Sequence, residues 1–269
     1  MKEIISLITT YEFIWRAFAA GLMIALCASL LGVTIVLKRL SMIGDGLSHI
    51  SFGGIAAGAV FGVAPLKIAI PLAAICSVIL FKMEGKKMKG DSGIAIISSG
   101  ALAIGIILIS LKGSSADMNN YLVGSLYSVT KDDLVLCFGL CIAVIASFVF
   151  LYNRIFAVTF DEDFSRATGV KSGFYTTVIA VLTSVTVVLG RRIMGALLIS
   201  ALLVFPALSA MRVFKSFRGV TLCSAAISVV AFLVGFVLTL VFDSVPTGAC
   251  IAVTNLAVFM VFTLVSKIK

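Results

Sequence analysis

Long apolar runs separated by short polar stretches repeat along the whole chain. Each run has roughly 20 residues, the length that an α-helix needs to cross a hydrocarbon layer about 30 Å thick. The pattern predicts an all-α, polytopic integral membrane protein with about nine transmembrane helices, and an eight-span alternative stays open. The predicted spans cover residues 13–37, 42–62, 65–82, 93–111, 133–153, 174–190, 193–211, 219–241 and 248–266.

The composition agrees with a membrane protein and not with a water-soluble one. Apolar residues make up 61% of the chain, the mean hydropathy is +1.21 and charged residues make up 12%. A soluble domain carries about twice this share of charged residues. Because the spans follow one another closely, residues 1–269 are expected to form a single transmembrane domain, with no room for a separate soluble domain.

Basic residues gather in alternate loops and at the C-terminus, which the positive-inside rule places in the cytoplasm. Seven of the 21 basic residues lie elsewhere, among them Arg191 and Arg192, which fall between two closely spaced spans on the opposite side. The net charge of +9 is explained by this bias beside anionic lipid, so no nucleic-acid partner is expected. The cytoplasmic set is Lys38, Arg39, Lys82, Lys86, Lys87, Lys89, Arg154, Arg166, Lys171, Arg212, Lys215, Arg218, Lys267 and Lys269.

Asp45 and His49 stand out as ionisable residues inside an apolar stretch, and His49 is the chain's one histidine. In a helix, two residues four positions apart lie on the same face. Ionisable groups at membrane depth are costly and usually functional. A carboxylate with an imidazole suits zinc, manganese or ferrous iron, and an incomplete ligand shell permits release. A purely structural hydrogen bond between the two side chains is the alternative, and we favour a metal site.

Two further features of the spans concern packing or gating. Gly54, Gly58 and Gly62 repeat every four residues, a pattern that lets a neighbouring backbone approach. Pro206 lies inside an apolar span, where it frees a backbone carbonyl and predicts a kink that could serve as a mobile element or simply as a packing feature.

One cytoplasmic segment, residues 156–171, is amphipathic. Phe156, Phe160, Phe164 and Ala167 recur at helical spacing and predict one short helix with a single apolar stripe. An acidic cluster, residues 161–163, suits the first turn of such a helix. An exposed aromatic stripe either lies on the membrane or docks into a protein groove, and the acidic cluster favours a protein partner.

Motifs of the common hydrolases do not occur in the chain. There is no G-x-x-x-x-G-K-[ST] phosphate loop, so the chain is not expected to hydrolyse ATP through that motif. The absence of H-E-x-x-H and G-x-S-x-G argues against proteolysis and ester hydrolysis. With one histidine, a membrane enzyme that uses bound metal is a remote alternative.

Three stretches, in this order and spacing, resemble the permease subunits of bacterial ABC importers for zinc, manganese or iron: LKRLSMIGDGLSHISFGGIAAG, FDEDFSRATGV and GRRIMGALLISALLVFPALSA. The segment GDGLSHISFGG is most similar to the corresponding segment of zinc-uptake permeases of Gram-positive bacteria. The resemblance covers nearly the whole chain. Glu162 departs from the pattern, since the family often has proline at that position.

The resemblance implies a homodimeric permease of the bacterial cell (inner) membrane. It also implies an extracytoplasmic metal-binding protein, two copies of a separate cytoplasmic ABC ATPase, and metal as cargo with no permanently bound cofactor. Asp45 and His49 match the family's metal ligands. The family's ATPase-contacting helix falls on a stretch that contains Phe160, Asp161, Glu162, Asp163, Phe164, Arg166 and Gly169.

The predicted function is therefore import of a divalent transition metal, zinc first, by a transport subunit that is not itself an enzyme. A proton-coupled secondary transporter is the main alternative, because Asp45 and His49 both titrate and could exchange metal for protons. ATP dependence of uptake distinguishes the two.

Overall fold

A computed structural model describes residues 11–83, 90–112, 129–241 and 245–268, and in these ranges the regular structure is entirely α-helical. The helices in chain order are α2 (Glu12–Leu37), α3 (Ile43–Phe61), α4 (Pro65–Met83), α5 (Gly90–Lys112), α7 (Lys131–Phe150), α8 (Tyr152–Phe160), α9 (Glu162–Ala167), α10 (Ser172–Met194), α11 (Ala196–Val213), α12 (Phe217–Val241) and α13 (Thr247–Ile268). The predicted all-α membrane class is confirmed.

Eight of these helices are long and apolar enough to span a membrane, and α3 is not among them. Each of the nine predicted spans nevertheless corresponds to a helix, and α3 fills the predicted span 42–62. The first half of α3 carries Asp45, His49 and several glycines and serines, which lower its hydropathy. Most residues of α3 are buried against other helices of the protein. The structure is thus consistent with eight or nine spans.

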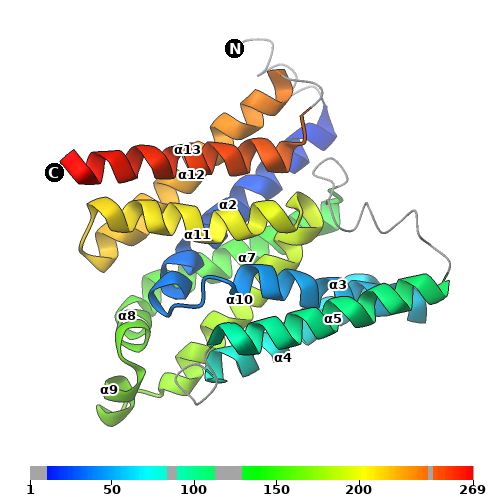
Figure 1. The fold of residues 1–269 in the computed structure, drawn as a ribbon, viewed down its shortest axis with the longest axis horizontal. Helices are drawn as coiled ribbons and strands as arrows, with labels where there is room; N and C mark the ends of the chain where they lie inside the picture. The colour runs from blue at the N-terminus through cyan, green and yellow to red at the C-terminus, as the bar shows by residue number, and fades with distance from the viewer. Residues whose placement is uncertain (1–10, 84–89, 113–128, 242–244, 269) are drawn as a thin grey trace.

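Helix α2 lies at the centre of one group of helices, and α3 belongs to another. Helix α2 packs against α7, α10, α11 and α12, whereas α3 packs mainly against α4 and α5 and touches α10 and α11. Figure 1 shows α3, α4 and α5 side by side at one edge of the molecule, with α11 and α13 running in nearly the same direction. The two groups meet where α10 contacts both α2 and α4.

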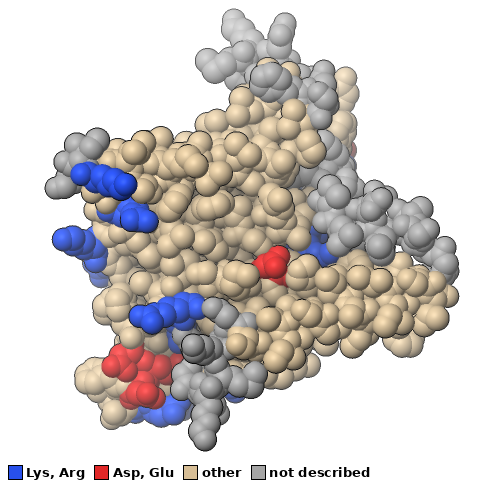
Figure 2. Space-filling model, in the orientation of Figure 1, with Lys and Arg blue, Asp and Glu red and all other residues tan. Residues whose placement is uncertain are grey.

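Charged side chains concentrate at one end of the molecule. On the face drawn in Figure 2, most Lys and Arg lie at the left, the end at which α8, α9 and the C-terminus lie in Figure 1. Acidic residues gather there too, over α9. This grouping agrees with the predicted cytoplasmic loops, although Lys86, Lys87, Lys89 and Lys269 lie outside the described residues.

The segment 156–171 differs from its prediction. It is not one helix with a single stripe but two helices, α8 and α9, separated at Asp161, whose backbone is extended (φ −151°, ψ 99°). The Asp161 carboxylate caps α9 by accepting a hydrogen bond from the Phe164 backbone N–H at 2.8 Å. The four-residue spacing of phenylalanines runs across this break, so the spacing alone could not reveal it. Gly169, with φ +83°, follows the end of α9, as expected for a stop signal.

Candidate functional site

Asp45 and His49 lie one turn apart on the same face of α3, as their spacing predicts. The distance between His49 Nε2 and Asp45 Oδ2 is 3.5 Å. Asp45 is in the first turn of α3, where the positive end of the helix dipole stabilises a carboxylate. Both polar atoms can therefore approach one cation without a change of helix geometry.

The Asp45–His49 pair is only partly covered by the rest of the chain. The Asp45 side chain is 52% exposed and that of His49 is 30% exposed, while the residues on either side of Asp45, Gly44 and Gly46, are buried. A carboxylate that faced lipid would be strongly destabilising. The pair must therefore face an aqueous path or a second protein surface.

A single chain supplies an incomplete ligand set. Among the described residues, no group of three or more His, Cys, Asp or Glu is placed to hold a metal ion. The hydroxyls near His49 do not add to the pair: Ser48 is buried and donates to the Gly44 carbonyl at 2.8 Å, and Ser51 is also buried. Two ligands with open positions suit a site that binds a cation and releases it.

Glycines fix α3 against both of its neighbours. A Cβ on Gly54 would lie 2.6 Å from Ala69 Cα, and one on Gly58 would lie 2.7 Å from Pro65 Cα, so both glycines permit close contact with α4. Gly62 differs from the expectation, because a Cβ there would meet no atom within 4 Å; Gly62 instead ends α3 with φ +68°. A second close approach, which the repeat did not indicate, places Gly53 against the Ala101 carbonyl of α5.

Pro206 lies inside α11 and is buried. Its ring leaves the Leu202 carbonyl without the usual helical donor. Helix α11 reaches both α2 and α3 through Leu203: a Cβ on Gly32 would clash with the Leu203 carbonyl oxygen, and one on Gly44 would lie 2.7 Å from Leu203 Cδ1. A gating role for Pro206 stays a prediction, and its setting beside α3 is compatible with one.

Exposed phenylalanines mark the α8–α9 segment. Phe160 is 59% exposed and Phe164 is 65% exposed. Phe160 also belongs to an aromatic cluster, with ring centroids 4.8 Å from Phe156 and 6.2 Å from Phe217. Phe164 therefore offers the more fully available ring of the two for a contact outside the chain.

The acidic residues of the segment point in different directions. Asp161 caps α9 and Asp163 is exposed, whereas Glu162 turns inward to the Lys38 ammonium, with 3.0 Å between Oε2 and Nζ. Arg166 lies one turn after Glu162 and is 3.7 Å from its Oε1. The contact between Lys38 and Glu162 could not be predicted from the sequence, because the two residues are 124 positions apart.

Arg191 and Arg192 lie in the last turn of α10 and not in a connection between two spans. Arg191 is 1% exposed, and its guanidinium lies 5.2 Å from the centre of the Phe52 ring on α3. Arg192 forms an ion pair of 2.6 Å with Asp133, which is also part of the capping box that begins α7. Both arginines thus help to fix α10 against its neighbours α3 and α7.

Comparison with known proteins agrees with this architecture. The chain is 29% identical to the manganese import system permease protein ScaB of Streptococcus gordonii, over 97% of this chain and 94% of that protein. It is 30% identical to the high-affinity zinc uptake system membrane protein ZnuB of Buchnera aphidicola, over 91% of this chain and 94% of that protein.

A solved structure gives the same result for the fold. A chain of PsaBC from Streptococcus pneumoniae, in complex with Fab, superimposes with a TM-score of 0.85 and 27% identity, over 97% of this chain and 94% of that chain. The model of the ABC 3 transport family matches residues 10–266. The chain is therefore a membrane-embedded member of the ABC 3 transport family.

Proposed function

We propose that this chain is the permease subunit of an ATP-driven importer of a divalent transition metal, with zinc as the first candidate and manganese or iron next. The observation that carries the proposal is the Asp45–His49 pair, 3.5 Å apart on one face of a membrane-embedded helix, in a chain of this family. The carboxylate supplies charge compensation. The imidazole favours transition metals over calcium and magnesium, which prefer oxygen ligands.

Two copies of the chain form the pathway in this proposal. The pair is too exposed to face lipid and too small to complete a metal shell. A symmetric dimer brings two carboxylates and two imidazoles together, which makes the four ligands of a tetrahedral zinc site. This argument is also the physical reason to place zinc before manganese, which prefers more oxygen ligands. The names of the relatives do not distinguish the metals, because they include both.

A separate cytoplasmic ABC ATPase dimer supplies the energy, and an extracytoplasmic metal-binding protein delivers the cargo. The chain has no phosphate-binding loop of its own. The α8–α9 segment is the ATPase contact, with Phe160 and Phe164 as the anchors that enter a groove of the ATPase. Asp161 and Gly169 hold α9 in shape by defining its two ends. The C-terminus lies on the same, cytoplasmic side.

The test is metal transport by the purified permease–ATPase complex in sealed vesicles. The ATPase lies on the outer face, where ATP is supplied, and the metal is enclosed, so import activity appears as release of metal from the vesicles. Zinc, manganese and iron are compared at equal free concentration. We expect ATP-dependent transport, with zinc transported best. Transport driven by a proton gradient without ATP would contradict the proposal and support the proton-coupled alternative. Membership of the ABC 3 transport family does not support that alternative.

A further inference from the structure

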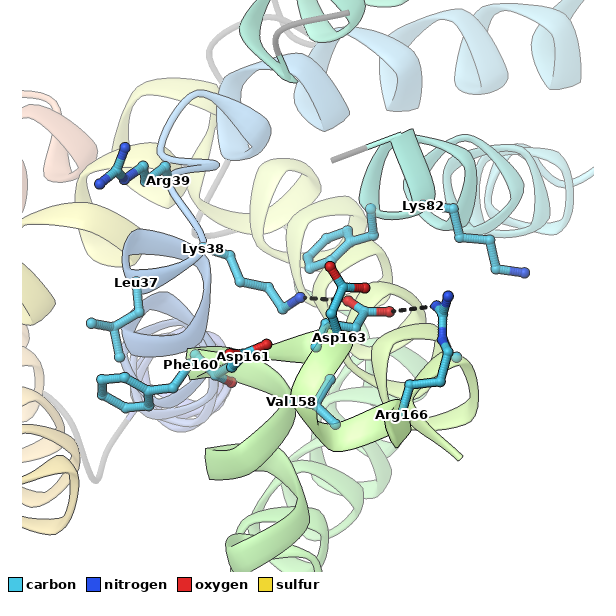
Figure 3. Close-up of a pocket in the computed structure, with 13 residues that line it drawn as sticks. Leu37, Lys38, Arg39, Lys82, Val158, Phe160, Asp161, Asp163 and Arg166 are labelled. Atoms are coloured by element: carbon cyan, nitrogen blue, oxygen red, sulfur yellow. Dashed lines mark hydrogen bonds and ion pairs between the residues drawn. The ribbon is translucent and has the colours of Figure 1, made fainter. Parts of the chain in front are cut away.

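A buried lysine ends helix α2 and reaches across to α9. The Lys38 side chain is 5% exposed, and its ammonium lies 3.0 Å from Glu162 Oε2, whose side chain is 29% exposed. Figure 3 shows Lys38 extending from the end of α2 toward the carboxylate that also faces Arg166. A charge removed from water in this way is tolerated only if it is paired. The contact therefore fixes the position of α9 relative to α2.

Glu162 joins three helices. Its Oε2 accepts hydrogen bonds from Lys38 of α2 and from the Thr176 hydroxyl of α10, the latter at 3.2 Å. Glu162 is itself the first residue of α9. Among the described residues, α9 otherwise packs on α8 and α10. The carboxylate thus links α9 both to the end of α2 and to α10.

Open space lies beside this connection. A cavity of about 620 Å³ is lined by Lys38 and Arg39 after α2, by Phe81 and Lys82 of α4, and by residues of α8 and α9. Figure 3 shows Asp163 close to the carboxylate that Lys38 contacts, and Lys82 farther away on α4. A cavity, and not packed apolar side chains, separates α9 from α4. On the side of α9 that faces this cavity, the Lys38–Glu162 ion pair therefore connects α9 to the end of α2.

The chain after Lys38 is tightly folded and leads directly to the metal pair. Arg39 has φ +57°, and the Leu40 N–H donates to the Ile35 carbonyl at 3.0 Å, which closes the end of α2. Leu40 and Ile43 are 1% and 0% exposed, so the turn is anchored in the core. Asp45 follows in the first turn of α3. A displacement of Lys38 should therefore also displace the start of α3, because the residues between them are held in a fixed conformation.

We propose that Lys38 and Glu162 are positioning residues that couple movement of α9 to the metal-binding end of α3. The inference rests on the proposed function, since it assigns α9 to the ATPase and Asp45 to the metal. When the ATPase moves α9, the ion pair moves the α2–α3 turn and thereby changes the access or the geometry of the Asp45–His49 pair. The pair does not contact the metal.

The experiment compares purified permease–ATPase complexes that carry Lys38→Met, Glu162→Gln, or both. Lys82→Met is the matched control, because Lys82 lines the same cavity but is exposed and lies outside the ion pair. Three quantities are measured: ATPase retained on the permease, ATP hydrolysed, and zinc transported. The double variant removes both charges and so leaves neither partner buried and unpaired.

We expect each single variant to retain the ATPase and to transport about tenfold less zinc per ATP hydrolysed, a change within the usual range of coupling between two sites. The double variant should show about the same loss as the single variants and not their product, since the two residues act as one unit. Lys82→Met should keep the wild-type ratio.

Two results would overturn the inference. One is zinc transport and ATP hydrolysis that both proceed at the wild-type rate in an assembled double variant. The other is a proportional fall of hydrolysis and transport, which would reduce the ion pair to a structural role. A wild-type complex that transports no divalent metal would instead reject the proposed function itself.

Discussion

Phe164 is expected to carry a large part of the affinity between the permease and its ATPase. The side chain is 65% exposed on α9. With about 200 Å² for a phenylalanine side chain, roughly 130 Å² is available for burial, which corresponds to about 3 kcal/mol. Aromatic anchors at interfaces commonly lose about 2 kcal/mol or more on truncation to alanine. Phe164→Ala should therefore weaken ATPase binding by about 30-fold or more.

The assay is the dissociation constant of the purified ATPase for the permease in lipid nanodiscs. Phe61→Ala is the matched control, because Phe61 is 70% exposed but ends α3 at the opposite end of the molecule from α9. The thermal stability of the permease alone should be unchanged in both variants, as neither ring is buried. An unchanged dissociation constant for Phe164→Ala would refute the reasoning and leave α9 as a membrane-surface helix.

Two further predictions concern the dimer and the α7–α10 contact. In a background without native cysteines, Met42→Cys, which is exposed just before Asp45, should give a cross-linked dimer in active complexes, and exclusive recovery of monomer would count against a shared pathway. Arg192→Met should lower the free energy of unfolding in detergent by about 2–3 kcal/mol, because it leaves the Asp133 carboxylate, 4% exposed, without its partner. Asp132→Asn, an exposed change in the same helical turn, should cost less than about 0.5 kcal/mol, and equal losses in the two variants would contradict the assignment.

Features set by local spacing could be predicted from the sequence. Apolar runs of membrane length predicted the helices, because a helix satisfies its backbone hydrogen bonds in lipid within a single segment. The four-residue spacing of Asp45 and His49 predicted that both lie on one face of a helix, because this relation depends only on helix geometry. The glycine repeat correctly predicted close packing at Gly54 and Gly58. It did not predict that α3 ends at Gly62, where the positive φ angle and not a close neighbour requires glycine.

Features that depend on distant partners could not be predicted. Lys38 reads as an ordinary basic loop residue until the fold brings Glu162 to it across 124 positions. The sequence places Arg191 in the connection between two spans, whereas the structure places it in α10, where packing on α3 buries it against Phe52. The break between α8 and α9 is an intermediate case. The helix cap formed by Asp161 was a local signal for it, but the regular spacing of phenylalanines pointed to one continuous helix.

The most direct test of the metal site is zinc uptake by the reconstituted complex with Asp45→Ala or His49→Ala in both copies. Ser48→Ala is the control, because its buried hydroxyl lies on the same helix and bonds only the Gly44 carbonyl among the contacts described. The account predicts loss of uptake in either alanine variant at normal expression and normal ATPase assembly, with uptake retained in Ser48→Ala. Wild-type uptake by either Asp45→Ala or His49→Ala would contradict the assignment of this pair as the site through which the metal passes.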